Sequence, residues 1–93
     1  MPTTTPKKTL KTAGLTEAAL RQLVAGGVVT AIRVSRERDA TYVVLADMGA
    51  THAQLLNTRG EPRTFSSLDT AAAAVARLGA SEFITDLTPL KAR

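Results

Sequence analysis

Arginine side chains gather around two turns of the sequence, and they are the residues whose type and spacing best suit a chemical task. If both turns project together, their guanidinium groups can follow the phosphate backbone of DNA or RNA. Arginines in turns also serve simply to keep a chain soluble and to protect sheet edges. The candidate nucleic-acid contacts are Arg33, Arg36 and Arg38 at the first turn, Arg59 and Arg63 at the second, and Lys7, Lys8 and Lys11 near the N-terminus.

Catalytic chemistry has few candidate groups in this chain. His52 is the one histidine, cysteine is absent, and the carboxylates are scattered singly along the sequence. A histidine base needs a positioned partner, and no nucleophile, phosphate-loop, dinucleotide or metal-ligand motif occurs. We therefore expect a protein that is not an enzyme and that has no metal, cofactor or small-molecule substrate.

The net charge of +4 lies in the ends of the chain rather than in its middle. Residues 1–12 hold three lysines and no acid, and residues 88–93 hold one lysine and one arginine. Residues 13–87 hold seven arginines and eight acids, a formal charge of −1. This distribution weakens the prediction of nucleic-acid binding. We expect a disordered basic tail at 1–12, a single α+β domain at 13–87 and a flexible C-terminal tail at 88–93.

The hydrophobic pattern changes between helical and strand periods along the chain. It predicts an α+β fold, in which two helices pack against a small, mainly antiparallel sheet of four to five strands, in the order α-β-β-β-(β)-α-β. Serine or threonine begins each helix and glycine ends it. The expected elements are a helix after Thr16, strands at 28–35, 41–48 and 52–58, a short edge strand at 62–65, a helix from Ser66 or Ser67 to Leu78, and a strand at 82–87.

Two helices on one face of the sheet would leave the other face partly apolar. The candidates for this second face are Val29, Ala31, Val43 and Leu45. Because soluble monomers rarely expose large apolar patches, we expect a second copy or another protein to cover it. The prediction is a homo-oligomer, most simply a dimer.

The cellular location is predicted from what the sequence lacks. No apolar run approaches the roughly 20 residues that span a bilayer. The segment MPTTTPKKTLKT also lacks the apolar centre of a secretory signal. These features favour a cytoplasmic protein that does not bind membranes.

From about Leu15 to Leu87 the sequence resembles the ParC-type partition-associated proteins of plasmids. The likeness is carried by LRQLVAGGVVTAIRV, by RGEPRTFSSLDTAAAAVARLG and by SEFITDL. The resemblance implies a non-enzymatic accessory role in the partition or maintenance of a mobile element, through protein contacts.

The runner-up function is a small DNA- or RNA-binding protein that uses the arginines of the turns and the lysine tail. The order of one helix, three strands and one helix is similar in topology to a double-stranded-RNA-binding domain. That family carries a lysine cluster where its second helix begins, whereas residues 66–70 here hold one acid and no lysine.

Overall fold

The computed structural model describes residues 13–37 and 39–86. It confirms the α+β class, with two helices and six strands in a mixed sheet. The elements are β1 (Ala13–Leu15), α1 (Glu17–Ala25), β2 (Ala31–Arg36), β3 (Tyr42–Met48), β4 (Thr51–Leu55), β5 (Thr64–Phe65), α2 (Leu68–Arg77) and β6 (Ile84–Asp86). The predicted tails at 1–12 and 88–93 lie outside these ranges, as do Lys7, Lys8, Lys11 and Arg38.

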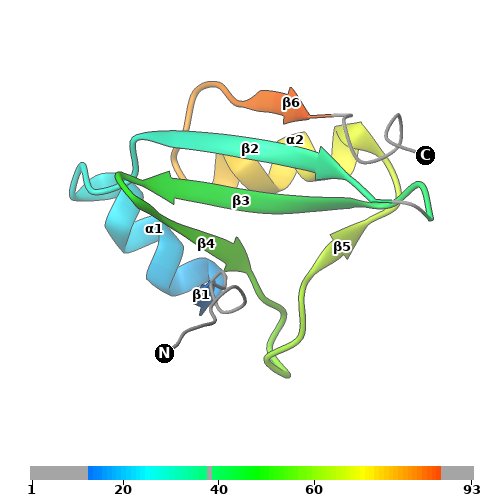
Figure 1. Cartoon of the computed structure of the whole chain (residues 1–93), viewed down its shortest axis with the longest axis horizontal. Helices are drawn as coiled ribbons and strands as arrows, with labels where there is room; N and C mark the ends of the chain where they lie inside the picture. The colour runs from blue at the N-terminus through cyan, green and yellow to red at the C-terminus, as the bar shows by residue number, and fades with distance from the viewer. Residues whose placement is uncertain (1–12, 38, 87–93) are drawn as a thin grey trace, which may run out of the picture.

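The sheet has the strand order β1-β4-β3-β2-β6, and β5 pairs with β3 (Figure 1). The hairpin-connected pairs β2–β3 and β3–β4 are antiparallel, and so is β3–β5. The two outer pairs, β1–β4 and β2–β6, are parallel. Parallel neighbours need a crossover, and α2 provides one by carrying the chain from β5 across the sheet to β6.

Each helix is bounded by the residues that its sequence predicts. Thr16 caps α1 by accepting a hydrogen bond from the Ala19 amide, and Ser67 does the same for α2 from the Thr70 amide. Both helices end in a Schellman motif, because Gly27 and Gly79 adopt φ angles of 79° and 97°. The motif joins the amide of Val28 to the carbonyl of Leu23, and the amide of Ala80 to the carbonyl of Val75.

The cap of α2 gives a test that separates two neighbouring serines. Ser67 accepts the Thr70 amide hydrogen bond at 3.2 Å, whereas Ser66 lies outside the cap. We expect Ser67→Ala to lower the free energy of unfolding by about 1 kcal/mol. Ser66→Ala should change it by less than about 0.5 kcal/mol. Urea unfolding followed by circular dichroism checks this, and equal losses in both variants would contradict the assignment.

The hydrophobic core lies between the two helices and one face of the sheet. Strands β2, β3 and β4 contribute alternate residues, and α2 contributes a stripe that includes Ala71 and Ala74. These small side chains let the helix approach the sheet closely. The most buried core residues are Leu20, Val34, Val44, Ala46, Ala53, Leu55, Ala71, Ala74, Val75 and Leu78.

The structure differs from the sequence prediction mainly at the sheet edges. Strand β1 was not expected, and β2 begins at Ala31 rather than at Val28. Val28 is excluded from β2 because its amide closes the end of α1. The last two strands are also shorter than predicted, and Leu87 lies outside the described residues.

Candidate interaction surface

The second face of the sheet, called the open face below, carries the side chains that alternate with the core residues. Paired residues of neighbouring strands point to the same side of a sheet. The register therefore places Ile84, Arg33, Leu45 and Gln54 in one row across β6, β2, β3 and β4. Figure 1 looks onto this face, with α2 behind β2 and β3. Neither α1 nor α2 covers it.

Three of the four residues predicted for the self-association face lie on the open face. Ala31 and Leu45 are half-buried there, whereas Val43 exposes only 4% of its surface within the single chain. Val29 does not join them, because it precedes β2 and packs against the core.

The sequence interpretation missed Ile84, the most exposed large hydrophobic residue in the described ranges, at 57%. It lies opposite Arg33 in the parallel pair of β2 and β6. Its apolar character in a short strand was visible in the sequence. Its face was not, because this depends on the register of a strand that is joined to β2 only through a crossover.

A cluster of three charged or titratable side chains interrupts the apolar part of the open face. The carboxylate of Asp47 accepts a hydrogen bond from Arg33 at 3.0 Å and lies 2.8 Å from Nδ1 of His52. Burial raises the pKa of Asp47, but the hydrogen bonds to His52 and Arg33 outweigh it, so the pKa lies below the ordinary 3.8. The open face is thus a mixed surface, in which Leu45, Ala31 and Ile84 surround paired charges of both signs.

Among the described residues, the structure does not bring the arginines of the two turns together. In Figure 1 the β2–β3 turn lies at the right-hand end of the sheet, and the β4–β5 turn lies at its lower edge. Arg33 pairs with Asp47, Arg63 with Glu17 at 3.4 Å and Arg59 with Glu61 at 3.9 Å, while Arg36 ends β2. The described residues hold six arginines and eight acids, a formal charge of −2.

The described residues contain no group of three or more histidine, aspartate or glutamate side chains arranged to hold a metal ion. Neither α1 nor α2 is long and apolar enough to cross a membrane.

Comparison with known proteins supplies the family. The family described as ParC-like matches residues 15–93, which include every described element after β1. The chain belongs to the ParC-like family. The family resemblance predicted from the sequence is therefore confirmed. No curated protein and no solved structure gives a significant match.

A second charged cluster ties the two helices of this ParC-like chain together. Glu17, in the first turn of α1, bonds Arg21 at 2.8 Å, Arg77 at the end of α2 at 3.4 Å, and Arg63 before β5 at 3.4 Å. Arg63 also lies over the ring of Phe65, 5.2 Å from its centre. Because the cluster joins three separate segments, we interpret it as a structural clamp.

The pKa of Glu17 makes this clamp sensitive to acid. Burial raises the pKa of Glu17, but hydrogen bonds from Arg21 and Arg77 outweigh it and hold the pKa below the ordinary 4.5. A carboxyl whose pKa is lower in the folded state stabilises the fold above its unfolded pKa, and this stabilisation is lost as the pH falls through the folded pKa.

We therefore expect the free energy of unfolding to fall as the pH is lowered from about 5 to about 3. The Glu17→Gln variant should start less stable and lose less stability over the same range, because it has no carboxylate to protonate at this site. Urea unfolding at several pH values measures both curves. Parallel curves for the two proteins would show that Glu17 does not contribute to acid sensitivity.

Proposed function

We propose that this ParC-like protein is a small non-enzymatic accessory factor in the partition or maintenance of a plasmid or another mobile element, and that it acts in the cytoplasm through protein contacts. The observation that carries the proposal is the placement of both helices on one face of the sheet. The open face keeps Ile84 exposed and Leu45 and Ala31 partly exposed. Transient protein interfaces likewise mix apolar and polar area, since as a whole they are only about as apolar as the rest of a protein surface.

The first partner that we propose for the open face is a second copy of the chain. A two-fold symmetric interface requires a surface that is complementary to itself. The open face meets this requirement in its charges, because Arg33 and Asp47 lie on neighbouring strands beside Leu45. In a dimer with a two-fold axis, Arg33 of each copy can pair with Asp47 of the other copy, while Leu45 and Ile84 become buried between them.

A non-enzymatic role is supported by the way the only histidine is used. His52 is about half-exposed, and its ring contacts Asp47, which already pairs with Arg33. An acid engaged with an arginine is less able to polarise a histidine toward a substrate. We therefore regard these three residues as part of the contact surface.

Nucleic-acid binding is the alternative that an experiment must separate from this proposal. The full chain and a Lys7→Gln, Lys8→Gln, Lys11→Gln variant are compared in mobility-shift assays with duplex DNA and duplex RNA over a range of salt. We expect weak binding that the variant loses, because the described residues carry a negative charge. Strong binding by the variant, with a steep dependence of affinity on salt, would favour the alternative.

A further inference from the structure

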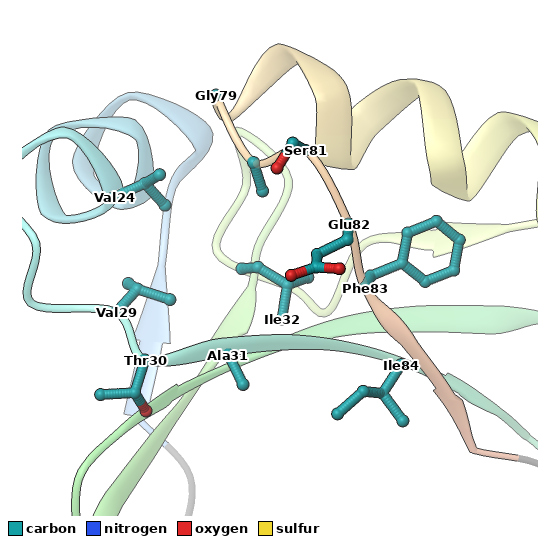
Figure 2. A pocket seen from close by; sticks show the side chains of 11 residues that line it. Val24, Val29, Thr30, Ala31, Ile32, Gly79, Ser81, Glu82, Phe83 and Ile84 are labelled. Carbon is teal, nitrogen blue, oxygen red and sulfur yellow. The ribbon is translucent and has the colours of Figure 1, made fainter.

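A groove lies beside the beginning of β2, between the end of α1 and the segment that leads from α2 into β6 (Figure 2). Its volume is about 520 Å³, within the range of sites that hold small ligands or a few side chains. Val24 and Val29 line one side, Ile32 the base, and Phe83 and Ile84 the other side. The groove therefore combines apolar walls with polar groups from Thr30, Ser81 and Glu82, and through Ile84 it continues onto the open face.

Glu82 places a negative charge beside the apolar side chains of this groove. Figure 2 shows its side chain directed into the groove, above Ile32. Within residues 13–37 and 39–86, no hydrogen bond or ion pair engages its carboxylate. Asp47 on β3 is by contrast held by Arg33. An exposed acid beside apolar walls is complementary to a cation attached to an apolar segment.

The backbone of β2 adds a third feature to the same place. Strand β2 begins at Ala31, but β6 pairs with it only from Arg33, which lies opposite Ile84. The edge of β2 beside Ala31 and Ile32 therefore carries no strand in the described part of the chain. An extended peptide can bind to such an edge through its backbone, while its side chains enter neighbouring pockets.

We propose that this groove binds an extended segment of a protein partner in which an apolar side chain lies next to a lysine or arginine. The apolar side chain packs against Val24, Val29 and Ile32, and the cation pairs with Glu82. The backbone of the segment lies along Ala31, in line with β6. This inference rests on the proposed function as a protein-contact factor and names the chemistry of a second partner.

The probe for this proposal is the blocked hexapeptide acetyl-Thr-Lys-Leu-Lys-Val-Thr-amide, added to the ¹⁵N-labelled full chain. We expect saturable amide shifts at Thr30, Ala31 and residues 81–84, with a dissociation constant of about 1 mM or less. A peptide with both lysines replaced by glutamate should cause none. Shifts that cluster elsewhere, or no saturable shift with the lysine peptide at about 5 mM, would overturn the proposal.

Two variants distinguish a specific effect of the Glu82 carboxylate from a general effect of the net charge of the chain. Glu82→Gln should weaken binding of the lysine peptide about fivefold, because it removes one ion pair. Glu61→Gln, which removes an exposed acid from the β4–β5 turn, should bind as the native chain does. Equal affinities for all three proteins would also overturn the proposal. Association of the chain with itself is measured separately, by sedimentation equilibrium. Absence of peptide binding would therefore count against the groove alone, and absence of a dimer would count against the open face alone.

Discussion

Replacing Leu20 with alanine should lower the free energy of unfolding by about 3 kcal/mol. Leu20 is fully buried. The structure describes all of α1, and Leu20 is the one buried residue of this helix. The helix is thus attached to the core chiefly through this side chain, with Leu23 and Val24 half-buried beside it. A cavity at Leu20 removes both the transfer free energy of the side chain and its packing contacts.

Urea and thermal unfolding measure this loss, which corresponds to a fall of about 15 °C in melting temperature for a domain of this size. Leu68→Ala is the matched control, because Leu68 exposes 36% of its surface at the start of α2. It should cost less than about 0.5 kcal/mol. If Leu20→Ala costs less than about 1 kcal/mol, α1 does not depend on this contact as the structure indicates.

Replacing Leu45 with glutamate should weaken association of the chain with itself about 100-fold. Leu45 lies in the middle of the open face, opposite Arg33 on β2 and Gln54 on β4. Each substitution occurs twice in a two-fold interface, so its cost to the free energy of association is doubled. The fold itself should tolerate the change, since Leu45 is outside the core cluster.

Sedimentation equilibrium over a range of concentrations gives the dimer constants of the native and variant chains. Val28→Glu is the matched control, because it also adds an acid in place of an exposed apolar residue, but Val28 lies at the end of α1 rather than on the open face. Its dimer constant should equal that of the native chain. Equal losses in both variants would indicate a general effect of charge.

The helices of this fold could be predicted from the sequence because their signals are local. Thr16 and Ser67 cap them, and Gly27 and Gly79 end them, through bonds that span only a few residues. The central strands β2 and β3 were also predictable, since apolar residues recur along both segments and a short polar stretch joins them.

The sheet edges could not be predicted in the same way, because they depend on contacts between distant segments. Strand β1 has three residues and exists only through its parallel pairing with β4, so its sequence carries no strand signal of its own. Gly14 fits there because any side chain would collide with Leu56, which lies within 3 Å of the added atom. The placement of Ile84 on the open face follows likewise from a pairing that only the fold shows.

The charged residues also divide into what the sequence shows, which is their type and position, and what only the fold shows, which is their pairing. Their type and sequence position suggested a shared phosphate site, but pairing depends on which segments meet. Glu17 and Arg77 are 60 positions apart and become neighbours only when α1 and α2 pack on the same face. Arg33 and Asp47 meet only through the antiparallel pairing of β2 and β3.

The measurement that most directly tests whether the open face is a contact surface uses a soluble paramagnetic relaxation agent on the methyl-labelled native chain. In a single chain Ile84 exposes 57% of its surface and Val28 exposes 48%, so the agent should reach Ile84 at least as well. If a second copy covers the open face, the Ile84 methyl groups relax more slowly than those of Val28 at high protein concentration. Relaxation of Ile84 that equals or exceeds that of Val28 under those conditions would contradict the proposed interface.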